Sequence, residues 1–202
     1  MKGLLIKDFS VLTRQMRIFL VMIVVFAMLP STSINLSYFA VIYAAMMPYT
    51  SLAYDERSKW NQLAGTMPYS KKEIVLSKYI LGWCFIAATA LIALAAGAVA
   101  SRFYNNTGYA LGIALSVCVA VIMMDITLPA MFRIGVERGR MFFTLIMVLL
   151  ACSAGGLVGS VIDTADAQPL LRLLNLIFPA AAVILTFISI PLSAWLYARR
   201  DR

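Results

Sequence analysis

The chain has 202 residues, of which 62% are hydrophobic and only 13% are charged, and its formal net charge is +8. A soluble domain is usually about half apolar and about a quarter charged, so this composition excludes an ordinary soluble domain. Six membrane spans of about 20 residues each would use most of the chain and leave little for a separate soluble domain. The positive charge suits contact with anionic lipid headgroups, and we do not expect nucleic-acid binding.

The chain contains no histidine, which removes several classes of active site. Zinc sites that use histidine, Ser-His dyads and HExxH proteases are all excluded, whereas Ser-Lys or carboxylate chemistry is not. The three cysteines, Cys84, Cys118 and Cys152, each fall inside an apolar stretch, so neither a disulfide framework nor a metal-ligand spacing is present. We therefore expect no metal site on this chain; that it carries no catalytic residue is an expectation that rests on the family resemblance described below.

Residues 1–17 have the pattern of an amphipathic helix. Apolar residues recur at spacings of four, three and four, which places them on one helical face: Leu5, Phe9, Leu12 and Met16. The same segment holds four basic residues: Lys2, Lys7, Arg14 and Arg17. This pattern predicts an interfacial helix on the membrane surface, and the alternative is an ordinary solvated start to the first span.

Apolar stretches then follow in chain order at 18–30, 35–53, 77–100, 108–131, 141–162 and 173–196. They predict an all-α integral membrane protein in which residues 1–202 form a single domain of six transmembrane helices. A cleavable signal peptide is less favoured for 18–30, because a long polar segment precedes it and no A-x-A site follows.

The basic residues indicate the orientation of these spans. With the N-terminus placed in the cytoplasm, fifteen of the 17 lysines and arginines fall on the cytoplasmic side, and only Arg102 and Arg172 fall outside. Cytoplasmic loops of membrane proteins carry an excess of lysine and arginine. We therefore expect both termini to lie in the cytoplasm.

The longest polar segment, residues 54–78, follows the second span and would be cytoplasmic. Asp55 and Glu56 are expected in the first turn of a cytosolic helix, where carboxylates suit the positive end of the helix dipole. Gly65 is a plausible terminator of that helix, and Pro68 enforces a break. The segment thus predicts a helix, a turn and a second helix.

Ser70 begins the second of these helices in our interpretation. Ser70 and Glu73 have the spacing of a capping box, and the helix would run on into the third span. Trp60 is a large apolar ring in a charged stretch, so it needs a partner surface, a fold back onto the bundle or the headgroup region. The alternative is that 54–78 is simply a solvated loop.

Asp125 is the one acidic residue inside a predicted span, about two turns before Arg133. A carboxylate at membrane depth is costly and by default faces the bundle interior, a cavity or a partner. Two interpretations are open. Asp125 either lines the inner end of a translocation path or locks helices together.

Two stretches of the chain resemble the small ABC-2 type permeases of Gram-positive bacteria. In the first stretch the matching residues are Asp55-Glu56, Lys59-Trp60, Pro68-Tyr69-Ser70-Lys71-Lys72-Glu73-Ile74-Val75 and Ser77-Lys78-Tyr79. In the second they are Leu128-Pro129, Phe132-Arg133-Ile134-Gly135 and Glu137-Arg138-Gly139-Arg140. The Met-Lys-Gly-Leu-Leu-x-Lys-Asp opening is also similar to that family.

The resemblance implies the transmembrane subunit of an ATP-driven exporter in a bacterial plasma membrane. Such a subunit pairs with a separate ABC ATPase, which binds ATP and Mg, and with a second permease copy as a homodimer. The absence of a GxxxxGKS or GxxxxGKT phosphate loop agrees with dependence on a partner for energy. The pattern is similar to that of exporters of amphipathic or antimicrobial peptides, so the resemblance implies a substrate of that class.

The resemblance also implies which residues meet the ATPase. The coupling residues would be Asp55, Glu56, Arg57, Lys59, Trp60, Pro68, Ser70, Lys71, Lys72 and Glu73. A second motif at an inner boundary would comprise Pro129, Arg133, Gly135, Glu137 and Arg140.

Three other functions are compatible with parts of the sequence. One is an intramembrane lipid-processing transferase or protease, against which the lack of histidine and of paired acidic residues in the spans counts. Another is a peptide self-immunity or sensing ABC module. The third is a proton-coupled secondary carrier that uses Asp125.

Overall fold

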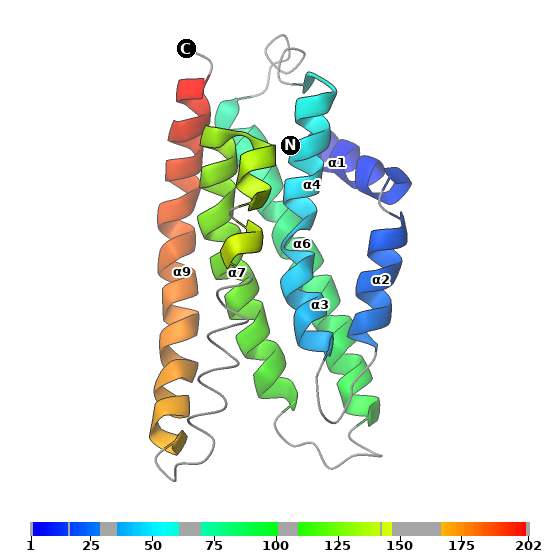
Figure 1. Ribbon diagram of the computed structural model, residues 1–202, viewed down its shortest axis with the longest axis vertical. Helices are drawn as coiled ribbons and strands as arrows, with labels where there is room; N and C mark the ends of the chain where they lie inside the picture. The colour runs from blue at the N-terminus through cyan, green and yellow to red at the C-terminus, as the bar shows by residue number, and fades with distance from the viewer. Residues whose placement is uncertain are drawn as a thin grey trace.

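The computed structural model describes residues 2–15, 17–28, 36–60, 70–100, 109–141, 143–146 and 167–200. Across these ranges the chain is helical and contains no strand. The helices are α1 (Lys2–Gln15), α2 (Arg17–Ala27), α3 (Leu36–Ala44), α4 (Met47–Arg57), α6 (Lys71–Ala100), α7 (Tyr109–Ile134) and α9 (Ala167–Arg200). All but α1 run along the long axis of the molecule, and α1 lies across it (Figure 1). The expected all-α fold is therefore observed in the described residues.

One end of the bundle brings together α1, the last turns of α4, α7 and α9, and the first turn of α6 (Figure 1). Exposed basic side chains gather in these segments and in the helical stretch over 136–141 that follows α7: Arg57, Lys72, Arg133, Arg138 and Arg140. We call this end the basic end. It is the end that the charge pattern of the sequence assigns to the cytoplasm.

Within the described ranges, three helices are long and apolar enough to cross a membrane: Lys72–Val99, Tyr109–Ile134 and Ile177–Tyr197. They match the predicted spans at 77–100, 108–131 and 173–196. The predicted first span contains α2, which has 11 residues, and most of the predicted fifth span lies outside the described residues. The six-span layout therefore stays a prediction, whereas an apolar, helical membrane protein is what the structure supports.

The predicted second span, 35–53, is divided into two helices. Between α3 and α4 the amides of Ala45 and Met46 bond to the carbonyls three residues earlier, at 3.1 and 2.9 Å. Pro48 has no amide proton and a fixed φ, so it suits the first turn of a helix but cannot continue one. The chain therefore restarts as α4 at Met47, and α4 continues four residues past the predicted end, to Arg57.

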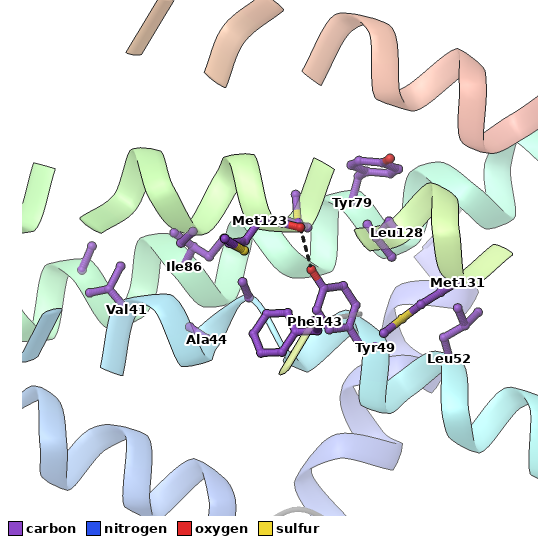
Figure 2. Packing of buried hydrophobic residues seen from close by; sticks show 14 of the residues in the cluster. Val41, Ala44, Tyr49, Leu52, Tyr79, Ile86, Met123, Leu128, Met131 and Phe143 are labelled. Atoms are coloured by element: carbon purple, nitrogen blue, oxygen red, sulfur yellow. Dashed lines mark hydrogen bonds between the residues drawn. The ribbon is translucent and has the colours of Figure 1, made fainter. Parts of the chain in front are cut away.

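The core lies between α3, α4, α6 and α7, with Tyr49 near its centre (Figure 2). The Tyr49 hydroxyl donates to the Met123 carbonyl at 3.3 Å, and its ring meets Phe143 edge-on with 5.4 Å between centroids. Gly82 permits the close approach of α6 to α7, because a Cβ there would lie 2.3 Å from the Met124 sulfur. This packing fixes α4 and α6 side by side below the basic end.

The helix α1 turns Leu4, Asp8 and Leu12 toward the bundle, and all three are buried. Phe9, which belongs to the predicted apolar face of Leu5, Phe9, Leu12 and Met16, is 56% exposed, and Met16 lies outside the described residues. An exposed apolar side chain suits a helix that lies on a membrane surface. The interfacial position of α1 stays a prediction.

Candidate functional site

A buried cluster of four charges joins α1, α4 and α6 at the basic end. The Lys78 ammonium lies 2.8 Å from both carboxylate oxygens of Asp8 and 2.5 Å from Oδ2 of Asp55. The Lys78 ammonium also donates to the Ser51 hydroxyl at 2.8 Å. The Lys7 ammonium reaches Oδ1 of Asp55 at 2.6 Å and Oδ1 of Asp8 at 3.0 Å. Two cations and two anions cancel, which allows these charges to be buried.

The position of Asp55 in α4 corrects the sequence-based expectation. Asp55 and Glu56 lie in the last turn of α4, not in the first turn of a new cytosolic helix. Carboxylates at that end face the negative pole of the helix dipole, so they need compensation from elsewhere. Lys7 and Lys78 supply it for Asp55, and both lie far from Asp55 along the chain.

The end of α4 folds back toward α1. Lys59 has a φ of 52°, in the left-handed region, and the amide of Ser58 bonds to the Tyr54 carbonyl at 2.9 Å. The next residue, Trp60, places its ring 4.2 Å below the Lys7 ammonium, at cation–π distance. Of the three surroundings that the sequence left open for Trp60, the structure shows the fold back onto the bundle, against α1.

Glu56 links α4 to the segment that follows α7. Its Oε2 accepts a hydrogen bond of 3.1 Å from the amide of Val136, the first residue of a helical stretch over 136–141. Gly135 ends α7 with a φ of 95°, a conformation that favours glycine. A Cβ on Gly139 would lie 2.2 Å from Cγ of Met131, so glycine there lets the stretch pack against α7.

An open pocket of about 550 Å³ lies between the end of α4 and this stretch. Its lining includes five charged residues: Glu56, Arg57, Glu137, Arg138 and Arg140. All of these but Glu56 are exposed. The structure therefore brings together the two motif segments, whose linked residues Glu56 and Val136 are 80 positions apart in the chain.

The predicted capping box at Ser70 is confirmed. The Ser70 hydroxyl accepts from the Glu73 amide at 3.2 Å, and Glu73 Oε2 accepts from the Ser70 amide at 3.0 Å. The helix α6 begins immediately after Ser70, as the motif predicts. Pro68 and the predicted turn around it lie outside the described residues.

The other predicted residues are more scattered. Lys72 is exposed in the first turn of α6, Arg133 is exposed in the last turn of α7, and Pro129 is buried within α7. The side chain of Lys71 lies outside the described residues. Neither Arg133 nor Pro129 lines the pocket at the end of α4.

Asp125 belongs to a separate polar cluster inside the bundle. Its Oδ2 lies 2.5 Å from the Thr186 hydroxyl, and the Ser189 hydroxyl donates to its backbone carbonyl at 2.6 Å. The Tyr79 hydroxyl lies 2.5 Å from Ser189 and 2.8 Å from Ser193. These contacts join α6, α7 and α9, so they favour the helix-lock interpretation over a path-lining role.

Sequence reasoning missed Asp8 and Lys78 as members of the site. A signal was present, because Asp8 lies one turn from both Leu4 and Leu12, and Lys78 adjoins the buried Tyr79. A charge at a buried helical position needs an opposite charge nearby. The sequence does not show which of the distant charges provides it.

A protein-family model described as ABC-2 family transporter protein matches residues 3–198, and so spans the helices and both motif segments. No curated protein and no solved structure matches the chain. In this family the membrane component carries no catalysis, and the ATPase is a separate subunit. The chain therefore belongs to the ABC-2 transporter family, as the membrane component of an ABC transporter.

Proposed function

We propose that the chain is the transmembrane subunit of an ATP-driven exporter and that its basic end receives the ATPase in the cytoplasm. The observation that carries this proposal is the hydrogen bond from the Val136 amide to Glu56, with the pocket beside it. Either segment alone would suit a solvated loop. Two motif segments held on one surface provide the fixed shape that a docking partner needs.

The contacts behind this surface support a mechanical role. Asp55 is bonded to α1 and α6 through Lys7 and Lys78, and its neighbour Glu56 is bonded to the stretch after α7. A displacement at the end of α4 would therefore be passed directly to these elements. The chain supplies transmission, and the partner ATPase binds ATP and Mg.

The exposed charges define the chemistry of docking. Arg57, Arg138 and Arg140 outnumber Glu137 among the exposed pocket residues. Guanidinium groups bind carboxylates and carbonyl oxygens in a fixed planar geometry. We infer an ATPase surface that presents acidic side chains or helix C-terminal carbonyls to this pocket.

Co-purification from the native host tests the ATPase assignment. We expect wild type to bring down a P-loop ATPase and the double variant Arg57→Glu, Arg138→Glu to lose most of it. The matched control is Arg17→Glu, because Arg17 is also exposed but does not line the pocket. Retention of the ATPase by the double variant, or its absence from wild type, would overturn the docking site.

The proposed assembly contains two copies of this chain and two ATPase subunits, in a bacterial plasma membrane. The proposed substrates are amphipathic or antimicrobial peptides, which the resemblance of the two motif segments supports. Proteoliposomes that contain the complex should accumulate such a peptide only when ATP is supplied. Peptide-stimulated ATP hydrolysis without net movement would instead indicate a sensing or immunity module. Movement that needs a proton gradient but no ATPase would indicate a secondary carrier.

A further inference from the structure

Asp125 lies deep in the bundle, where a charge would be expensive. It is nine residues before the end of α7, or about 14 Å along the helix axis, and its exposed fraction is 3%. Its Oδ1 is buried and has no hydrogen-bond partner among the described residues. Asp125 also forms no salt bridge with any residue that the structure describes.

The protons around Asp125 can be counted. The Thr186 hydroxyl lies 2.5 Å from Asp125 Oδ2 and 2.8 Å from the Ala182 carbonyl oxygen. A hydroxyl has one proton to donate, and a carbonyl oxygen can only accept. Thr186 is placed to donate to either oxygen, but its one proton cannot serve both contacts in full. Each contact has a proton of its own when Thr186 donates to Ala182 and a protonated Asp125 donates to Thr186.

The neighbouring hydroxyl groups do not supply another hydrogen-bond donor to the Asp125 carboxyl. The Ser189 hydroxyl donates to the Asp125 backbone carbonyl, and the Tyr79 hydroxyl lies between the hydroxyls of Ser189 and Ser193. Donation from Ser193 to Tyr79 and from Tyr79 to Ser189 gives each contact in this row of hydroxyl groups one proton. None of these protons reaches the carboxyl oxygens of Asp125.

The titratable groups that face Asp125 from the adjoining helices are Tyr49 on α4 and Tyr79 on α6. Neither is a cation, and the Tyr49 hydroxyl donates to the Met123 carbonyl. On the same helix, Arg133 is about two turns away and exposed. An ionised Asp125 would be a buried charge with at most one donor, and a buried carboxyl in such surroundings takes up a proton instead.

We propose that Asp125 binds a proton in this conformation, and that the neutral carboxyl, by donating to Thr186, holds α7 against α9. The ligand of this site is the proton itself. Its loss would leave a negative charge at the α7–α9 contact, which would favour separation of the two helices and entry of water. This proposal is independent of the substrate and of the ATPase docking site.

Infrared spectroscopy of the whole transporter in a lipid bilayer tests the proposal, because a protonated carboxyl and a carboxylate absorb at different frequencies. The spectrum of wild type minus that of Asp125→Asn should contain the C=O band of a carboxylic acid. The matched control is Asp55→Asn, which removes a carboxylate that forms salt bridges with two lysines. Its difference spectrum should contain only carboxylate bands.

Two further variants protect the test against a folding defect. Asp125→Glu keeps the acid and should shift the band without removing it, and Thr186→Val should shift it by removing the acceptor. A carboxylate band, and no acid band, in the wild type minus Asp125→Asn spectrum would overturn the proposal. A carboxylic acid band whose frequency is the same in wild type, Asp125→Glu and Thr186→Val would overturn the proposal as well.

Discussion

Asp55 at the basic end and Asp125 in the middle of the bundle are both buried carboxyls, but their partners differ. Asp55 shares two lysines with Asp8, whereas the only side-chain contact that the described residues offer the Asp125 carboxyl is the hydroxyl of Thr186. Near the end of the bundle, long basic side chains reach inward from the surface. At the depth of Asp125 a proton is the simplest way to remove the charge.

This difference has a mechanical meaning. The four charges at the basic end bind α1, α4 and α6 strongly and leave the motif segments outside as a firm surface. The α7–α9 contact is the most extensive one between two helices in the described part of the chain, and the Asp125 side chain adds one hydrogen bond to it, with Thr186. We expect the basic end to move as one unit and the α7–α9 contact to respond to the protonation of Asp125.

The largest expected effect follows from removal of the central cation. Among the described residues, Lys78→Met would leave Lys7 as the remaining cation beside Asp8 and Asp55. The variant should lower the free energy of unfolding by about 3–5 kcal/mol. Unfolding in mild detergent, followed by circular dichroism, measures it. Adding Asp8→Leu should recover part of the loss, since it removes one uncompensated carboxylate. A Lys78→Met variant as stable as wild type would contradict a stabilising role of the charge cluster.

The same substitution at two carboxyls sharpens the comparison. Asp8→Asn removes a charged partner of Lys78 and should cost about 1.5–3 kcal/mol of unfolding free energy. Asp125→Asn replaces one neutral donor with another and should cost less than about 1 kcal/mol. Parallel unfolding of the two variants gives both values. Equal losses would contradict the contrast between Asp8, which has two lysine partners, and Asp125, which has no cationic partner among the described residues.

The turn after α7 should respond to a single methyl group. Gly135→Ala forces a side chain into the left-handed region and should cost about 1–2 kcal/mol of unfolding free energy. Thermal unfolding measures the loss. Gly135→Asn is the control, because asparagine tolerates this region better, and it should lie between alanine and wild type. An alanine variant that matches wild type would argue against the observed turn.

The smallest effect is expected at the start of α6. Ser70→Ala removes the hydroxyl that accepts from Glu73 and should cost about 1 kcal/mol of unfolding free energy. Ser70→Asp keeps an acceptor and should stay close to wild type. Chemical unfolding of the pair separates the cap from any general effect of substitution at this site.

Local patterns predicted part of the fold well. Ser70 and Glu73 specify their own hydrogen bonds, because both partners lie within one turn of helix. The long apolar runs predict α6, α7 and the apolar part of α9 for the same reason, since length and composition are local properties. Membership of the ABC-2 family likewise followed from short contiguous motifs.

Properties that depend on distant partners were not predictable. Asp55 and Glu56 had the local appearance of a helix start, yet they end α4 because Lys7, Lys78 and the Val136 amide compensate them. The burial of Asp8 on α1 was not predicted for the same reason, because its partner Lys78 lies 70 residues away. Apolar spacing alone cannot show that a carboxylate belongs on the buried face.

Site-specific photo-cross-linking tests the central claim most directly, namely that the two motif segments form one docking surface for the ATPase. A photoreactive residue would replace Arg57 in one variant and Arg138 in another, with Arg17 as the control position. If the two motif segments form one docking surface, positions 57 and 138 should both form covalent adducts with the same ATPase subunit, and position 17 should form none. Adducts from only one of the two pocket positions, or from neither, would contradict a single docking surface.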